Sequence, residues 1–396
     1  MKNTLKAITV LIAIATLLAL SLQNDGCKPQ GNPSIYDPNW KSLPQPVVDS
    51  ISPRNYSFAG VGQLTIYGKN FSDSVQNDGV FFNSTLATIV SASQTQLVVN
   101  SPNVVGDSVQ VRVYVIGAVD FSPPVTYKML AAVVPFGKLT GNVPVAMTTD
   151  AAGNLYATIT TKTGVGAGTF KYAPDGTSTL VEPSSNSWSG LKVGPGGYLY
   201  MARNVKAIFR VALSGGTASR WMTTPGSISD FDFDQNKVLW SGGSGGNAIY
   251  SITQAAVVKS FPFVGIVHSV RVFGSDLYVA AHSDTTEGVW KFHIYSSDSL
   301  GAPQQYFGFT AAYGASYSAL AISFTQDGDL YIGTDAPDAI VIVHPDGSYA
   351  PLYSGLLQPA VRTLAWGTGN NLYIGTTSGM YIVVAPKPGA PYYGAQ

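Results

Sequence analysis

The stretch Gly328-Asp-Leu330-Tyr331 belongs to a short motif that occurs six times in the sequence and decides the fold. Each copy has a leucine followed by a tyrosine or a tryptophan. The other five copies are Gly153-Asn-Leu155-Tyr156, Gly197-Tyr-Leu199-Tyr200, Lys237-Val-Leu239-Trp240, Ser275-Asp-Leu277-Tyr278 and Asn370-Asn-Leu372-Tyr373. Successive leucines are 38 to 53 residues apart, which is the length of one four-stranded propeller blade. The six copies therefore predict a six-bladed β-propeller.

The two ends of this repeat region are expected to pair with each other. After Leu372 the sequence offers one further strand, residues 379–385, so the last blade lacks an outer strand. Residues 131–139, upstream of the first copy, resemble residues 350–357 and can supply it. Such pairing would remove the open sheet edges that promote aggregation.

Turn residues support the same architecture. Glycine supplies the positive φ angle that tight hairpins need, and it precedes three of the six motif leucines by two residues. The third blade is the weakest, because its turn at residues 234–238 has no glycine. With the Pro-Asp-Gly turns at 174–176 and 345–347, the repeats resemble NHL-type and SMP-30-like six-bladed propellers. This resemblance implies a propeller over residues 130–396.

Short strands of a second kind precede the propeller. In residues 109–115 every odd position is valine, which is the two-residue period of a half-buried strand. Residues 64–71, Leu-Thr-Ile-Tyr-Gly-Lys-Asn-Phe, together with Asn100-Ser-Pro102, resemble the IPT/TIG family of immunoglobulin-like domains. The resemblance covers residues 45–129 and implies a small sandwich that serves as a spacer or an interaction module. The fold class is thus all-β, an immunoglobulin-like sandwich followed by a six-bladed propeller.

The N-terminus is typical of an exported bacterial protein. Lys2 and Lys6 precede an apolar run over residues 7–22, so residues 1–26 are interpreted as a signal peptide and residues 27–44 as a flexible tether. Cys27 is the only cysteine, and its position resembles the lipid acceptor of lipoproteins. The alternative is ordinary cleavage near residues 19–21, with Cys27 left as a free thiol. We expect membrane attachment by a lipid anchor, at the outer membrane or cell surface, or a periplasmic or secreted protein.

Composition excludes one class of partner. Charged residues make up 11% of the chain and balance at 22 basic against 22 acidic residues. Without an excess of positive charge there is no field to attract nucleic acid. A polysaccharide or a surface protein is the partner that we expect, and no cofactor is expected.

The innermost strands of a propeller line its central channel, so their polar residues are candidate ligand-binding groups. Counted back from the motifs, these residues are Lys192, Asp230, Asp232, His268, Arg271 and Arg362. They do not form the acidic cage of metal-dependent lactonases or the histidine set of lyases with this shape, so no metal site and no catalytic residue are assigned. The alternative is an ion-pair network between blades, with His268 as a structural histidine. His282 and Asp284 could pair on the rim.

The longest interval between motifs contains a tyrosine-rich segment, residues 295–317. Tyr313 and Tyr317, flanked by small residues, suit a recognition loop, because aromatic faces bury area at low entropic cost. Tyr306, Phe307 and Phe309 fit an outer strand equally well.

Three functions remain open at this point. The first is a non-enzymatic binding protein of the cell surface or periplasm, with polysaccharide as the first ligand class. The second is a hydrolase or lyase of the SMP-30 or NHL-like kind. The third is a scaffold whose propeller binds another protein. The absence of an acidic cage favours binding over catalysis.

Overall fold

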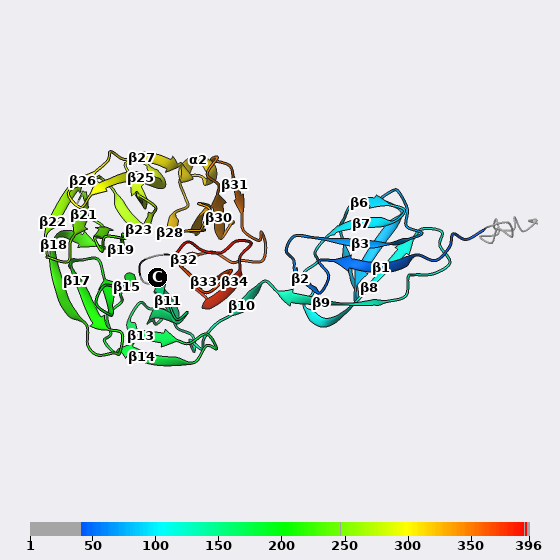
Figure 1. The fold of residues 1–396 in the computed structure, drawn as a ribbon, viewed down its shortest axis with the longest axis horizontal. Helices are drawn as coiled ribbons and strands as arrows, with labels where there is room; N and C mark the ends of the chain where they lie inside the picture. The colour runs from blue at the N-terminus through cyan, green and yellow to red at the C-terminus, as the bar shows by residue number, and fades with distance from the viewer. Residues whose placement is uncertain (1–40, 246, 392, 394–396) are drawn as a thin grey trace, which may run out of the picture.

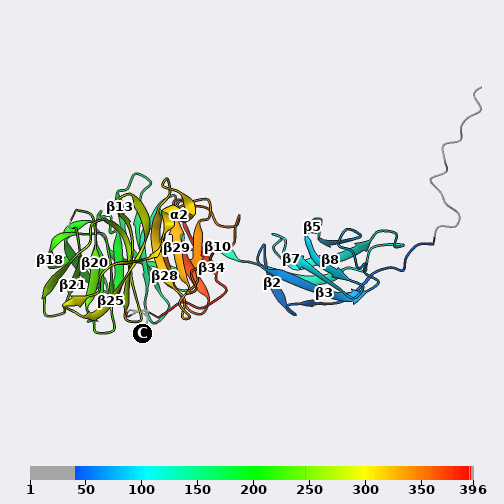
Figure 2. The same cartoon turned by 90° about the horizontal axis from the view of Figure 1, so that it is seen from above.

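A computed structural model describes residues 41–245, 247–391 and 393. Two β-rich units follow one another along the chain, first a two-sheet sandwich and then a ring of six sheets (Figure 1). Seen from above, the ring is a thick disc with the sandwich beside its rim (Figure 2). The expected fold class, an immunoglobulin-like sandwich followed by a six-bladed propeller, is confirmed. The signal peptide, Cys27 and most of the tether lie outside the described residues.

The sandwich encloses its own core between two sheets. Buried Val109, Val111 and Val113 alternate with outward residues, as the two-residue period predicts. One sheet has the order β1 (Val47–Ser52), β3 (Gln63–Lys69), β7 (Gln96–Asn100) and β6 (Ile89–Ser93). The other has the order β2 (Tyr56–Ala59), β9 (Val125–Ala131), β8 (Gly106–Val115), β4 (Asp78–Phe82) and β5 (Thr85–Ala87).

Each blade of the ring is an antiparallel sheet, and in blades 1, 2, 3 and 5 the strands follow chain order from the axis outward. Blade 1 contains β11 (Val143–Thr149), β12 (Leu155–Thr160), β13 (Gly166–Tyr172) and β14 (Ser178–Glu182). Blade 2 contains β15 (Gly190–Gly194), β16 (Tyr198–Ala202), β17 (Val205–Ala212) and β18 (Ser219–Ile228). Blade 3 contains β19 (Asp230–Phe233), β20 (Leu239–Gly242), β21 (Ala248–Ile252) and β22 (Val258–Pro262).

The other three blades vary at their outer edges. Blade 4 contains β23 (Ile266–Phe273), β24 (Asp276–Ser283), β25 (Thr286–Ser296), β26 (Ser299–Leu300) and β27 (Gln304–Phe307), with α2 (Phe309–Tyr313) following. Blade 5 contains β28 (Ala319–Phe324), β29 (Leu330–Thr334), β30 (Ile340–Val343) and β31 (Tyr349–Pro351). Blade 6 contains β32 (Val361–Trp366), β33 (Asn371–Thr376), β34 (Met380–Val384) and β10 (Val133–Pro135).

The repeated leucine–aromatic pair starts the second strand of each blade. All six leucines have 0% exposure, and the next side chain points to the other face of the sheet. In three blades that aromatic side chain hydrogen-bonds to the preceding turn, and in blade 2 Tyr200 Oη donates to Pro195 O at 3.2 Å. Tyr156 Oη donates to Asp150 Oδ2 at 3.2 Å, and Trp240 Nε1 donates to Asp234 Oδ2 at 2.9 Å. The motif therefore combines a buried core leucine with an aromatic side chain that stabilises the turn before it through a hydrogen bond.

The turn of blade 3 forms without glycine. Lys237 adopts φ +66°, the conformation that Gly153 and Gly328 supply in blades 1 and 5. Asp234 Oδ1 accepts hydrogen bonds from the backbone N–H of Asn236 and of Val238, and these bonds hold the turn. Asp150 Oδ1 makes the equivalent bonds to the N–H of Ala152 and of Asn154 in blade 1, so both turns have the same form and differ in the residue at positive φ.

Blade 6 is closed by the strand that enters the propeller. In β10, Val134 pairs with Ile382 of β34, and the N–H of Phe136 donates to Met380 O at 2.9 Å. On the inner side, Thr149 Oγ1 of blade 1 donates to Trp366 O at 2.6 Å. The expected pairing of the two ends is confirmed.

Candidate functional site

The first strands of the six blades surround the central channel, and each blade repeats the same strand direction. One cavity lies where these strands begin, and we call it the strand-start mouth. It is lined by Ser189, Lys192, Asp230, His268, Arg271 and Arg362 among other residues. A second cavity, the strand-end mouth, is lined by Asp232, Val272, Ser323, Trp366, Ala390 and Pro391 among others. Five of the six channel residues predicted from the sequence therefore reach the strand-start mouth.

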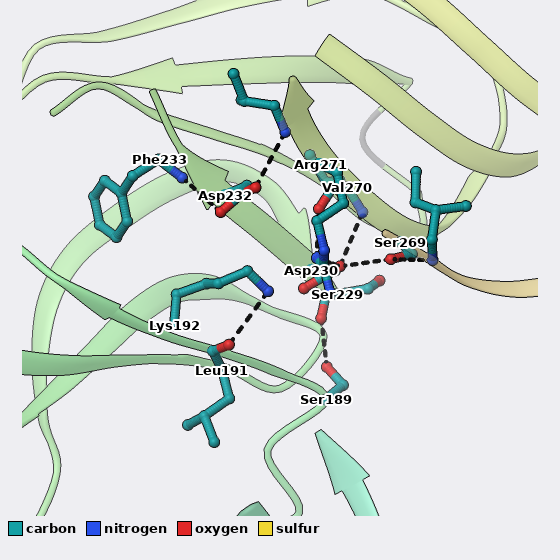
Figure 3. A network of polar contacts seen from close by, with 12 residues as sticks. Ser189, Leu191, Lys192, Ser229, Asp230, Asp232, Phe233, Ser269, Val270 and Arg271 are labelled. Atoms are coloured by element: carbon teal, nitrogen blue, oxygen red, sulfur yellow. Dashed lines mark hydrogen bonds and ion pairs between the residues drawn. The ribbon is translucent and has the colours of Figure 1, made fainter. Parts of the chain in front are cut away.

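Asp230 joins blade 3 to blade 4 (Figure 3). Its Oδ2 accepts hydrogen bonds from Ser269 Oγ at 3.0 Å and from the N–H of Val270 at 2.8 Å, and Arg271 Nη1 lies 3.1 Å away. All three donors belong to β23. Because Asp230 and Arg271 are both largely buried, this ion pair is a fixed part of the channel wall. The predicted network between neighbouring blades is present for this pair.

Asp232 makes a second bridge between the same two strands. Its Oδ2 accepts the N–H of Val272 at 3.1 Å, and its Oδ1 accepts the N–H of Phe233 at 3.0 Å. Burial raises the pKa of Asp232, and the charges of Lys192 and Arg271 partly oppose that rise. Asp232 is thus occupied with the backbone and lies at the strand-end mouth.

Lys192 departs from the predicted network. Its side chain is buried in the channel, where Nζ donates to Leu191 O at 3.4 Å (Figure 3). Among the described residues no carboxylate lies within 4.0 Å of this ammonium, so it has no ion pair. Burial, followed by repulsion from Arg271, lowers the pKa of Lys192 to about 8, while Asp230 and Asp232 oppose the shift. The expectation of an ion-paired lysine is wrong, because both aspartates are committed to β23.

Arg362 brings a further positive charge to the strand-start mouth. It lies on β32, its side chain is exposed, and it lines the same cavity as Lys192. Within the part of the chain that the structure describes, no carboxylate lies at ion-pair distance from its guanidinium. Two cationic groups without a paired carboxylate therefore share this cavity.

Two histidines and a glutamate of blade 4 lie beside this mouth. His268 Nε2 is 3.3 Å from Glu287 Oε1 without hydrogen-bond alignment, and His282 Nδ1 is 3.3 Å from Glu287 Oε2. Glu287 is 4% exposed, and its Oε1 also accepts the N–H of Ala319 at 3.2 Å. The expected pairing of His282 with Asp284 is wrong, since the buried glutamate takes that role.

Sequence reasoning missed Glu287, although one signal was available. The 396 residues contain only two glutamates, Glu182 and Glu287, and both are buried. Glu182 accepts hydrogen bonds from Trp188 Nε1 at 2.9 Å and Ser184 Oγ at 2.8 Å. In a chain with so few glutamates, one that lies next to a predicted strand is a candidate for a buried carboxylate that accepts hydrogen bonds within the core. Glu287 lies on β25, the third strand of blade 4, and not on an inner strand.

The predicted aromatic loop is packed rather than free. Tyr313 belongs to α2, stacks on Phe309 at 5.0 Å between ring centroids, and donates a hydrogen bond to Asp338 Oδ2 at 3.1 Å. Tyr317 is also half-buried against the core of blades 4 and 5. Tyr306 and Phe307 lie in the outer strand β27, as the alternative interpretation held, whereas Phe309 begins the helix α2, so the alternative is wrong for that residue. A ligand-binding role for Tyr313 and Tyr317 stays a prediction.

Residues 387–391 and Tyr393 lie at the strand-end mouth, where Ala390 and Pro391 form part of the cavity wall. The N–H of Ala390 donates to Phe324 O at 2.8 Å, and Lys387 Nζ lies 2.7 Å from Asp329 Oδ2. Tyr393 reaches Phe233 of blade 3, with 5.9 Å between ring centroids.

Two classes of feature are absent from the residues that the structure describes. These residues contain no group of three or more His, Cys, Asp or Glu side chains arranged to hold a metal ion. Across residues 41–245, 247–391 and 393, no helix is both long and apolar enough to pass through a membrane.

One family model matches the chain. Residues 46–129 match the family described as the IPT/TIG domain. This segment is the sandwich. No curated protein matches the chain.

Solved structures resemble the chain over both of its units. A Bacteroides thetaiotaomicron protein provisionally named a phosphatase has 10% identity and a TM-score of 0.54, over 88% of this chain and 98% of that one. An auxiliary nutrient binding protein from Bacteroides ovatus has 12% identity and a TM-score of 0.50, over 85% and 97%. Another auxiliary nutrient binding protein, from B. thetaiotaomicron, has 12% identity and a TM-score of 0.50, over 88% and 98%. At these identities the likeness shows the fold alone.

Proposed function

We propose that this chain is an exported, non-enzymatic binding protein whose propeller recognises its ligand at the strand-start mouth. The observation that carries the proposal is the makeup of that mouth. Side chains from blades 2, 3, 4 and 6 converge on one cavity, and Lys192 and Arg362 bring charge that no described carboxylate pairs. Polar groups that converge in a concavity and are left without protein partners are typical of ligand sites.

The arrangement of the chain supports a surface location. The sandwich precedes the propeller and lies beside its rim, so it would act as a spacer between an N-terminal anchor at Cys27 and the recognition platform (Figure 2). Two solved structures of the same fold are named auxiliary nutrient binding proteins. That analogy supports a binding role, and polysaccharide, the ligand class expected from the sequence, is the first to test.

Affinity electrophoresis of the chain from residue 28 onward tests the proposal. The gels contain plant, algal and microbial polysaccharides, and we expect retardation by at least one glycan. Arg362→Ala should reduce that retardation, whereas Lys206→Gln, at an exposed position on β17 away from the channel, should not. If no glycan retards the protein, the polysaccharide proposal fails, and pull-down from membranes then tests a protein partner.

The second candidate function is a hydrolase or lyase, and one observation favours it. His268 and His282 flank the buried carboxylate of Glu287 beside the mouth, and histidine and carboxylate side chains can act as general bases. Turnover of ester, lactone or uronide substrates that is lost in both His268→Ala and His282→Ala would support catalysis. Turnover that both variants keep would exclude this cluster as the catalytic site.

A further inference from the structure

The strand-start mouth has an excess of positive charge. Lys192, Arg271 and Arg362 line it, whereas Asp230 is the carboxylate on the same surface. Asp230 Oδ2 already receives three donors, including Arg271. The paired Arg271 and Asp230 cancel each other to first order. The buried Asp232 partly offsets Lys192 from the strand-end side, so the charge of Arg362 and the remaining charge of Lys192 are left for a ligand.

Lys192 is buried, so its ammonium group lacks the water that would otherwise accept its hydrogen bonds. The residue is 4% exposed, and its hydrogen bond to Leu191 O is long at 3.4 Å. An ammonium group carries three donors, and burial without partners for them costs free energy. A bound anion would supply the missing acceptor. Lys192 belongs to blade 2 and is buried in the channel, whereas Arg362 belongs to blade 6 and is exposed at the rim. The two donors therefore reach the cavity from different blades.

The size of the cavity limits the group that can enter. Its volume is about 20 Å³, which is room for one or two water-sized groups. A carboxylate has two oxygens and fits this limit, whereas a whole sugar ring does not. A dianionic phosphate would also face the nearby carboxylate of Asp230. The body of the ligand must therefore remain outside the channel.

We propose that the strand-start mouth binds a carboxylate group of the ligand, with Lys192 and Arg362 as donors on either side of it. This inference rests on the proposed binding function and narrows it to acidic ligands. A uronic acid residue of a polysaccharide presents such a group on a neutral ring, and so does a free sugar acid. The ring would rest at the rim beside His268 and Ser189, which line the same cavity.

The test compares an acidic oligomer with its uncharged ester and with three further ligands. Isothermal titration calorimetry of the chain from residue 28 onward uses oligogalacturonate, the same oligomer with methyl-esterified carboxyls, free galacturonate, a neutral glucan, and inorganic phosphate. We expect oligogalacturonate to bind and its ester to bind at least about ten-fold more weakly, which is the loss of one charge-assisted contact. Free galacturonate should compete for the same site.

Three variants locate the contact. Arg362→Gln and Lys192→Met should each weaken binding of oligogalacturonate about ten-fold and leave binding of the ester unchanged. Lys206→Gln carries the same loss of charge at a remote exposed site and should bind as the wild type does. Arg362 is exposed, so its variant is not expected to disturb folding, and it tests the contact independently of the buried Lys192.

Each contrary outcome has a distinct meaning. Binding of the glucan or of the ester that equals binding of oligogalacturonate overturns the carboxylate inference and leaves the polysaccharide function intact. Binding of free galacturonate without any oligomer keeps the carboxylate site and overturns the polysaccharide function. Tighter binding of phosphate than of galacturonate also overturns the choice of carboxylate. Binding of none of these ligands overturns the inference.

Discussion

Val134 of β10 lies opposite Ile382 of β34, and this pairing brings the entry strand and the last strand of the propeller into one blade. The strand order of blade 6 is therefore β10, β34, β33 and β32, with its outer member taken from the start of the domain. Unfolding of either end must open the ring. Closure of this kind couples the stability of all six blades to a three-residue strand.

Val134→Pro should destabilise the propeller. Phe136 N–H donates to Met380 O, and alternate residues of an antiparallel strand face the partner, so Val134 N–H is expected to face β34 as well. The native Pro135 occupies the outward position between them. Loss of the donor should cost about 1–3 kcal/mol and lower the melting temperature in calorimetry. Val134→Ala, which keeps the donor and trims a 43% exposed side chain, should change little. Equal melting temperatures for both variants would contradict the closure argument.

Lys192→Met should stabilise the protein at neutral pH and lose that advantage at high pH. The pKa of Lys192 is lowered from 10.5 to about 8 by burial. Between these two values the unfolded chain binds one proton more than the folded chain, so the free energy of unfolding of the wild type rises with pH. The difference between the two pKa values corresponds to about 3 kcal/mol. The ammonium therefore costs stability below pH 8, and the cost disappears as pH rises to 10.5.

Urea denaturation of the wild type and Lys192→Met between pH 6 and 11 measures this effect. The change with pH in the difference between the two unfolding free energies, from pH 8 to 10.5, reports the titration of Lys192. The size of that difference at any one pH is less informative, because the variant also loses the attraction of Lys192 to Asp230 and Asp232. The exposed Lys206→Gln serves as the control without such a slope. A difference that stays constant over the whole range would show that Lys192 titrates as an ordinary lysine.

The fold could be predicted because its signal is local and repeated. The buried leucine and the following aromatic residue recur in every blade, and the entry strand was recognised from its resemblance to residues 350–357. Blade 3 shows the limit of that approach. Its turn contains Lys237 at positive φ, held by hydrogen bonds to Asp234, and such side-chain support is invisible in a search for glycine.

The candidate site could be predicted only in part, because partners are decided by three-dimensional packing. The sequence placed Asp230 and Arg271 near the channel, and the structure pairs them. It could not foresee that the backbone of β23 would occupy both aspartates and leave Lys192 without an ion pair. Glu287 was missed for the same reason, since it reaches His268 and His282 across neighbouring strands.

Tyr313→Phe and Tyr313→Ala should separate packing from recognition at α2. The phenylalanine variant keeps the stack on Phe309 and loses the hydrogen bond to Asp338, so it should cost about 1 kcal/mol. The alanine variant also loses the ring and should cost about 3 kcal/mol or more. Chemical denaturation measures both values. A ligand-binding tyrosine on a free loop would instead show unchanged stability in both variants and a loss confined to binding.

Gly389→Val should displace residues 387–391 from the strand-end mouth. A Cβ atom at position 389 would lie 2.0 Å from Trp366 Cγ, a contact that real structures do not tolerate. The segment must then move, which breaks the hydrogen bonds of Ala390 N–H to Phe324 O and of Gln326 N–H to Pro388 O. We expect both amides to exchange hydrogen for deuterium at least about ten-fold faster, a change of about 1.4 kcal/mol in the local opening free energy.

Pro388→Ala is the matched control for this experiment, because the backbone carbonyl that Gln326 uses is retained. Its amides should exchange at the wild-type rate. Lys387 contributes a second anchor, with Nζ 2.6 Å from Asp327 Oδ2 and 2.7 Å from Asp329 Oδ2. The Lys387→Gln variant should therefore accelerate exchange less than Gly389→Val, since an ion pair with an exposed lysine contributes little. Unchanged exchange in Gly389→Val would mean that the segment does not rest on Trp366 in solution, and that the channel is open at both ends.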